Sequence, residues 1–253
     1  MFASDVDRSL FNEEQLVQID SCQVRSDKMR FLLNPSLNHL QMEQVRLGIE
    51  SGINVEIYAT EFISEDSMLQ IRLCLEEGLN PIVLSSNLSH GQLSIIRKAA
   101  KDGLDYSVMM NPSLSLYQMN AIYNCLKEGL DVSTLSNRLY DKNKISVIVA
   151  GLRKGLDVSK YTCDDYSFLQ MSEIYKGLCD GHDVSVYSSM DYNADQMMQI
   201  RFGLNDGVSV SKYADPSIPK EEMEKMRKSL RTENFNSHKK KFSLAPSSLF
   251  GII

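Results

Sequence analysis

Large apolar residues recur along the chain at intervals of about 26 residues, and each one anchors a short helical pattern. Further apolar residues stand three and seven positions after the anchor, as at Met42, Val45 and Ile49. These offsets place the side chains on one face of a helix and do not fit the alternation of a strand. The anchors are Leu16, Met42, Met68, Leu93, Met119, Ile145, Met171, Met197 and Met223.

Cap residues and glycines mark where these helices begin and end. Asn, Ser or Asp stands four residues before the anchor, and glutamine often follows three residues after this cap, as in Ser115 and Gln118. This is the capping box, in which two side chains bind the free amide groups of the first turn. A glycine ten residues after the anchor ends the helix, because glycine adopts the left-handed conformation without a clash. These glycines are Gly52, Gly78, Gly103, Gly129, Gly155, Gly181 and Gly207.

A second, shorter helix is predicted after each glycine. The residue two positions past the glycine is Asn, Asp or Ser, all suitable N-caps, and Pro81 after Asn80 fits the first helical position. Pro35, Pro112 and Pro216 mark the turn that follows. A unit therefore consists of a long helix, a glycine, a short helix and a turn.

A single unit can bury its one apolar face only against a neighbour. We therefore predict an all-α fold, an α-solenoid of about nine helix–Gly–short-helix repeats stacked in one elongated superhelix. Residues 1–11 form an N-terminal lead-in, residues 12–231 the repeat domain and residues 232–253 a C-terminal tail. This tail either caps the last repeat or docks on a partner through its apolar residues.

A small residue recurs six positions after the anchor, as at Cys74, Cys125 and Gly151. We expect it to let adjacent helices approach closely, which would leave the two thiols buried and inert. The five cysteines include no CxxC pair, an argument against both a zinc site and a disulfide framework.

Two of the units, Gln196 to Pro216 and Gln170 to Ser188, resemble a short helical repeat of gut Gram-positive bacteria and of their phages and conjugative elements. The resemblance covers roughly residues 12 to 233. It implies an α-solenoid and a mobile-element setting, in which inhibition of a host defence complex is an expected function. It implies no reaction.

The composition, 43% hydrophobic and 24% charged, is that of an ordinary globular chain. No apolar run approaches the ~18 residues of a membrane span, and the N-terminus lacks the build of a secretory signal. We therefore expect a cytoplasmic protein that does not bind membranes. A net charge of −6 gives little support to binding of duplex DNA.

No sequence motif of a known type of active site is present. The recurring Asp105, Asp131, Asp157 and Asp183 are explained as helix caps, and His182 stands where neighbouring units have a core leucine. We therefore expect no enzymatic activity, no cofactor and no metal.

Arginine and tyrosine form a ladder four positions after the anchor, for which two interpretations remain. In the first, the arginine stems pack over the next unit while the guanidinium groups pair with Asp or Glu. In the second, the ladder lines a groove for a peptide, a nucleotide or an acidic surface. The ladder consists of Arg46, Arg72, Arg97, Tyr123, Tyr175, Arg201 and Arg227.

Apolar residues two and five positions after the anchor form a second candidate surface, on the face that should be polar. Either the short helices cover these side chains, or the side chains bind another protein or a second copy of the chain. The main residues are Leu47, Leu73, Ile95, Val147 and Phe202.

These patterns predict a non-enzymatic repeat scaffold that binds another protein. The alternative is a repeat protein that binds nucleic acid or a nucleotide through the arginine and tyrosine ladder. Binding to phosphate would weaken steeply with salt, whereas binding through an apolar interface would change little.

Overall fold

The computed structural model describes residues 7–79 and 88–243, with side chains described up to residue 236. All regular structure in these ranges is helical, as predicted. The chain divides into two compact units, Met1–Arg138 and Leu139–Ile253. Within the described ranges, no helix combines the length and the apolar character needed to cross a membrane. The predicted cap Asn80, Pro81 and the last ten residues of the predicted tail lie outside the described residues.

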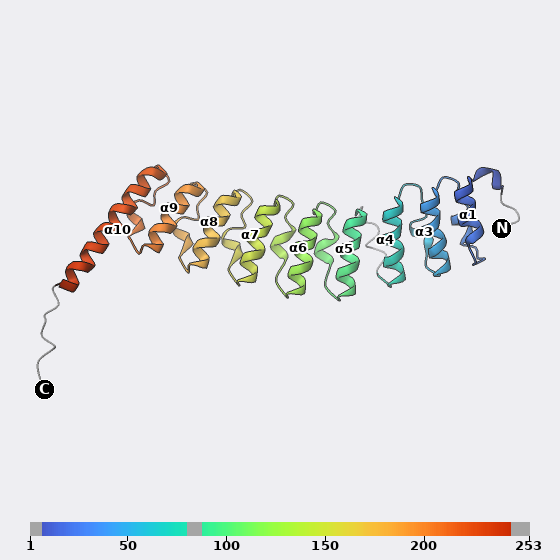
Figure 1. The fold of residues 1–253 in the computed structure, drawn as a ribbon, viewed down its shortest axis with the longest axis horizontal. Coiled ribbons are helices and arrows are strands. Elements are labelled where there is room, and N and C mark those ends of the chain that lie inside the picture. Colours follow the sequence, from blue (N-terminus) through green and yellow to red (C-terminus); the bar gives the residue numbers. More distant parts are fainter. Residues whose placement is uncertain (1–6, 80–87, 244–253) are drawn as a thin grey trace, which may run out of the picture. The chain divides into compact units, whose positions relative to one another are not determined.

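In each unit the long helices lie side by side in sequence order, and each packs against the next (Figure 1). The first unit contains α1 (Glu13–Ser21), α3 (His39–Glu50), α4 (Glu65–Glu76), α5 (His90–Lys101) and α6 (Leu116–Lys127). The second unit contains α7 (Lys142–Arg153), α8 (Phe168–Cys179), α9 (Ala194–Asn205) and α10 (Lys220–Ser243).

The predicted N-caps are confirmed for every long helix from α1 to α9. Each cap side chain accepts a hydrogen bond from a backbone amide of the first turn. The caps are Asn12, Asn38, Ser64, Ser89, Ser115, Asp141, Ser167 and Asn193. The glutamine that completes the capping box is present in α1, α3, α5, α6, α8 and α9.

The seven recurring glycines all have positive φ angles, between 66° and 76°, and each follows the end of a long helix. A residue with a Cβ atom is strained in this conformation, so glycine is the residue that allows the chain to turn here. In α10 the corresponding position is Glu233, and the helix continues to Ser243. The chain is therefore helical well beyond residue 231, where we had placed the end of the repeat domain.

The short helices are present as single 3-10 turns and as one short α-helix, α2 (Met29–Leu32). The predicted caps Asn54, Asp157 and Asp183 accept from the amide two residues further along the chain. Asp105 and Asp131 bind the amides of the equivalent residues at 2.9 Å. The 3-10 segments that follow the long helices are Val55–Ile57, Ser107–Met110, Ser133–Ser136, Val158–Lys160, Val184–Val186 and Val210–Lys212.

The lead-in also contains structure. Arg8–Leu10 forms a 3-10 turn capped by Asp7. The Arg8 guanidinium binds both carboxylate oxygens of Asp20 on α1 at 2.8 Å, and Phe11 is buried. These contacts attach the lead-in to the first repeat.

The small residue six positions after the anchor has a different role from the one we predicted. In four repeats it is glycine, and a tyrosine of the same repeat lies directly over it. A Cβ atom added to Gly151 would lie only 1.8 Å from the Tyr161 hydroxyl oxygen. The small residue thus makes room for the following short helix rather than for the adjacent long helix. The pairs are Gly48–Tyr58, Gly151–Tyr161, Gly177–Tyr187 and Gly203–Tyr213.

Each of these four tyrosines is fully buried, and its hydroxyl donates to a backbone carbonyl of its own long helix at 3.1–3.3 Å. Where the small residue is larger, the tyrosine is absent. Ala99 is followed by Met109 and Cys125 by Leu135, both fully buried at the tyrosine position. Burial also raises the pKa of the Cys74 thiol to about 11, in accord with an inert thiol.

Replacing Gly151 with Ala should lower the free energy of unfolding by about 2 kcal/mol, because the new Cβ atom would displace the buried Tyr161 ring. Helix propensity alone predicts the opposite sign, since Ala is favoured over Gly by about 1 kcal/mol. The double variant Gly151→Cys, Tyr161→Leu copies the native pair Cys125 and Leu135 and should recover part of the loss. Urea denaturation would measure all three proteins, and a stabilised single variant would refute the packing role.

The buried tyrosines predict a loss of stability in alkali. Burial raises the pKa of Tyr213 to about 12 and raises the pKa values of Tyr58, Tyr161 and Tyr187 as well. An unfolded tyrosine titrates near pH 10, so above about pH 10 the unfolded state loses protons that the folded state keeps. The contribution of these tyrosines to the free energy of unfolding should therefore be constant up to this pH and decrease above it. Urea denaturation across this range would test this, and Tyr213→Phe should flatten the decrease.

Candidate functional site

The capping glutamines connect the starts of α1, α3, α5, α6, α8 and α9 to the turn that precedes the next long helix. In α1, the Gln15 side-chain oxygen accepts from the Asn12 amide at 2.8 Å, while its nitrogen donates to the carbonyl of Leu37 at 2.6 Å. Gln41, Gln92, Gln118, Gln170 and Gln196 make the same kind of link. Within each unit, the starts of the long helices therefore lie along one edge. We call these helix starts and the turns before them the helix-start edge.

Large apolar side chains are exposed along this edge in both units. Phe62, in the turn before α4, is 88% exposed, and Leu169, in the first turn of α8, is 61% exposed. None of these side chains contributes to the core, since the buried anchor lies one turn further along each helix. The exposed residues are Leu40, Phe62, Leu116 and Tyr117 in the first unit and Leu139, Leu169 and Met190 in the second.

A groove of about 590 Å³ lies on this edge at the starts of α8 and α9. Leu169 and Met190 lie on its lining together with Asp191, Asp195 and Pro216. Gln170 and Gln196, which also line it, are held by their links to the following turns. The walls of the groove are therefore positioned by the capping boxes.

Sequence reasoning missed the helix-start edge. The signal was the presence of leucine and tyrosine directly after an N-cap, as at Leu116, Tyr117 and Leu169, where a solvated first turn is usually polar. The predicted pattern of buried positions begins at the anchor, so it did not include these residues of the first helical turn.

The five ladder arginines are bound within the chain, as in the first of the two interpretations. The Nε atom of each donates to a residue on the preceding long helix, two positions after that helix's anchor, at 2.9–3.3 Å. A second guanidinium nitrogen of each pairs with a carboxylate at 2.7–3.5 Å. The acceptors of the Nε atoms are Gln18, Gln44, Gln70, Glu173 and Gln199 for Arg46, Arg72, Arg97, Arg201 and Arg227, respectively.

At the two ladder tyrosines, the preceding long helix has an apolar residue two positions after its anchor, where the arginine junctions have a glutamine or glutamate acceptor. Tyr123 on α6 corresponds to Ile95 on α5. Tyr123 is buried, and its hydroxyl donates to the Asp102 carboxylate at 2.5 Å. Tyr175 on α8 corresponds to Val147 on α7. The side-chain nitrogen of Lys154 lies 5.8 Å from the centroid of the Tyr175 ring. A polar acceptor is thus matched by arginine in the next helix, and an apolar residue by tyrosine. The ladder belongs to the junctions between helices.

The predicted apolar surface is not exposed. Val147 is buried, and Leu47, Leu73, Ile95 and Phe202 are half-buried. Ile95 and Val147 occupy the acceptor position of the helix junctions, which explains their burial. Phe202 is covered by the guanidinium groups of Arg201 and Arg227, 4.8 and 5.4 Å from its ring centroid. Of the two alternatives, these residues follow the first, coverage within the chain, and neighbouring long helices contribute to that coverage.

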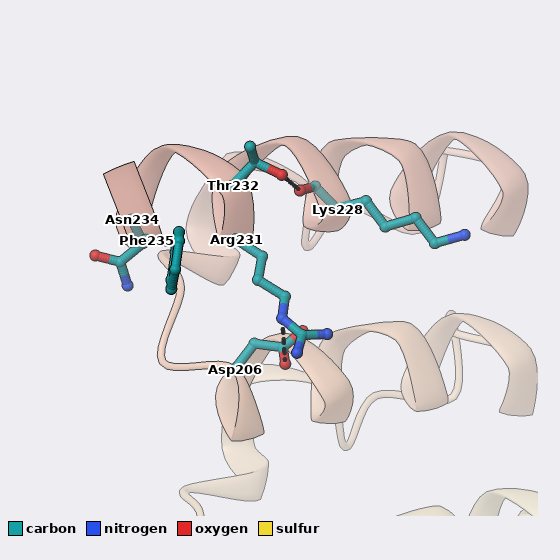
Figure 2. A pocket seen from close by; sticks show the side chains of 6 residues that line it. All are labelled: Asp206, Lys228, Arg231, Thr232, Asn234 and Phe235. Carbon is teal, nitrogen blue, oxygen red and sulfur yellow. Dashed lines mark hydrogen bonds and ion pairs between the residues drawn. The ribbon is translucent and has the colours of Figure 1, made fainter. Parts of the chain in front are cut away.

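A larger pocket, of about 720 Å³, lies between the end of α9 and α10. Figure 2 shows Arg231 extending from α10 towards Asp206, whose carboxylate lies 3.5 Å from its Nε atom. The Thr232 hydroxyl donates to the Lys228 carbonyl, and the Asn234 side chain donates to the Gly207 carbonyl. Phe235 is 68% exposed beside them. The polar groups that line this pocket are thus engaged with one another or with nearby backbone.

In the described part of the chain, no group of three or more His, Cys, Asp and Glu side chains could hold a metal ion. His182 is half-buried and hydrogen-bonded to Asn205, in accord with a packing role. Of the cysteines, Cys22, Cys74 and Cys125 are buried.

No protein-family model matches the sequence, and comparisons with curated proteins and with solved structures found no similar protein.

The junction between α8 and α9 should depend on Arg201. Glu173 and Arg201 are both more than 90% buried, and Arg201→Ala would leave one Glu173 oxygen without its partner. We expect a loss of about 3 kcal/mol, measured by urea denaturation. Arg231→Ala, at an ion pair that is two-thirds exposed on the arginine side, should change stability by less than about 1 kcal/mol. Equal effects of the two substitutions would contradict the junction role.

Proposed function

We propose that the two units form one α-solenoid, which acts as a non-enzymatic scaffold that binds another protein along its helix-start edge. The observation that carries this proposal is the series of exposed apolar side chains on that edge in both units. Such side chains contribute little to folding, and contiguous exposed apolar surface on a folded protein marks an interaction site.

Repetition supports the same function. Exposed apolar side chains lie in the first turns of α3, α6 and α8 and in the turns before α4, α7 and α9, so several repeats offer anchors to one extended partner. In the mobile-element setting implied by the repeat resemblance, we propose that the scaffold acts in the cytoplasm and inhibits a host defence complex by covering one of its surfaces. This function requires no cofactor.

The nucleic-acid alternative has weaker support. It relied on the ladder, whose arginines bind glutamine and carboxylate groups of neighbouring helices. A guanidinium group held in this way would have to exchange an internal partner for a phosphate. We therefore propose the protein-binding function as the primary one.

Affinity capture from a host lysate tests the proposal. Leu116→Ser with Leu169→Ser should reduce recovery of a stoichiometric partner at least tenfold, because each substitution removes an exposed apolar anchor from a different unit. Neither side chain is buried, so the melting temperature should fall only slightly, through the contact of Leu116 with Gly91 of α5. The control variant, Val17→Ser, removes an apolar side chain of similar exposure, 57%, in the middle of α1.

Recovery that resists nuclease and falls only in the edge variant would support the scaffold. Recovery that disappears with nuclease treatment would instead support the nucleic-acid alternative. Unchanged recovery in the edge variant would show that another surface binds the partner.

A further inference from the structure

From α8 to α10, the helix-start edge of the second unit is acidic as well as apolar, whereas the start of α7 carries Lys142 and Lys144. The turns before α8, α9 and α10 and their first helical turns cover residues 162–170, 188–196 and 214–222. These segments contain seven carboxylates and a single lysine, Lys220. The carboxylates are Asp164, Asp165, Asp191, Asp195, Asp215, Glu221 and Glu222, all exposed.

Helix capping accounts for only part of this charge. Asp195, Glu221 and Glu222 lie in first helical turns, where a carboxylate is favoured by the helix dipole. The other four carboxylates precede the N-caps, where interaction with the helix dipole does not explain a negative charge. They are Asp164, Asp165, Asp191 and Asp215. The chain therefore carries more negative charge at this edge than its helices need.

Two of these carboxylates line the groove. Asp191 and Asp195 lie on its lining together with Leu169 and Met190, which are 61% and 55% exposed. Asp195 is paired with Lys220 at 2.6 Å, whereas Asp191 is hydrogen-bonded to the neutral Ser189 hydroxyl at 2.8 Å. Hydrogen bonds from Ser217 lower the pKa of Asp215, so this carboxylate stays ionised. The groove thus presents two exposed apolar side chains beside two carboxylates.

We propose that the groove at the starts of α8 and α9 binds a segment of the partner protein in which apolar residues are flanked by lysine or arginine. This inference rests on the proposed function and adds the chemistry of the partner. Apolar side chains of the segment would cover Leu169 and Met190, and its cationic groups would lie against Asp191 and the neighbouring carboxylates. An acidic segment would be repelled.

The complementary charges predict a salt-dependent association. Opposite charges on the rim of an interface raise the association rate, and salt screens them over a distance of about 8–10 Å. The apolar contact with Leu169 and Met190 should persist in salt. Affinity should therefore fall moderately as salt is added without being lost, unlike the steep dependence of phosphate binding.

The first test uses a fluorescent amphipathic peptide of leucine and lysine and a matched peptide of leucine and glutamate. Fluorescence anisotropy with the full chain should detect binding of the lysine peptide alone. Asp191→Asn with Asp195→Asn should weaken it about tenfold, and Leu169→Ser with Met190→Ser should weaken it similarly. The control, Asp27→Asn with Glu56→Gln, neutralises two exposed carboxylates that follow the ends of α1 and α3, away from the helix-start edge, and should leave binding unchanged.

Equal losses in the control and in the groove variants would overturn the inference, because binding would then depend on net charge alone. Loss of self-association in the groove variants, measured by sedimentation, would also overturn it and assign the groove to a second copy, through its own basic run Lys239–Lys241.

The inference and the proposed function can fail separately. If the partner is captured equally well by the Asp191→Asn, Asp195→Asn variant and by the original chain, the partner chemistry proposed here is wrong. The scaffold function would still hold, since recovery of the partner would continue to depend on Leu116 and Leu169.

Discussion

In this protein, a single glutamine side chain forms hydrogen bonds with the backbone at the starts of two successive helices. The capping glutamine accepts from the amide of its own N-cap and donates to a carbonyl of the turn before the next helix. Because buried backbone groups must find partners, this side chain fixes the distance between the start of one helix and the start of the next. The arginine junctions and the tyrosines over glycine accompany this spacing, and they also occur where the glutamine is replaced, as in the Gln70–Arg97 junction after α4 and the Gly151–Tyr161 pair of α7. Lys144 replaces it in α7, donating to the Asp164 carbonyl.

The same arrangement frees the helix-start edge for function. The polar links occupy backbone groups of the turns and leave several apolar side chains of the first helical turns exposed. Leu169 is 61% exposed, and Leu116 is 48% exposed although it also lies beside Gly91 of α5. The apolar character of their exposed parts requires a different explanation. In a repeat protein this separates the residues that hold the array together from those that contact a partner.

Local interactions made the repeat predictable, and contacts between repeats made the surfaces hard to predict. The caps, the glycines and the helical period depend on residues within one turn of each other, so the sequence shows them directly. The burial of Val147 and the binding of Arg201 depend on which residue of the neighbouring helix lies opposite, and the hydrophobic period of a single repeat does not specify this. The role of Gly151 was misjudged for the same reason, since the side chain that needs the space is Tyr161. The helix-start edge is visible only once the core is known.

The matched junctions also bear on how such an array can gain or lose repeats by recombination. Removal of the repeat that contains α3 would place Gln18 of α1 opposite Arg72 of α4, a pair of the same type as Gln18 and Arg46. Removal of the repeat that contains α8 would instead place Val147 opposite Arg201, leaving a buried guanidinium without an acceptor. Copy number is therefore free to vary within runs of like junctions and is constrained where the junction type changes.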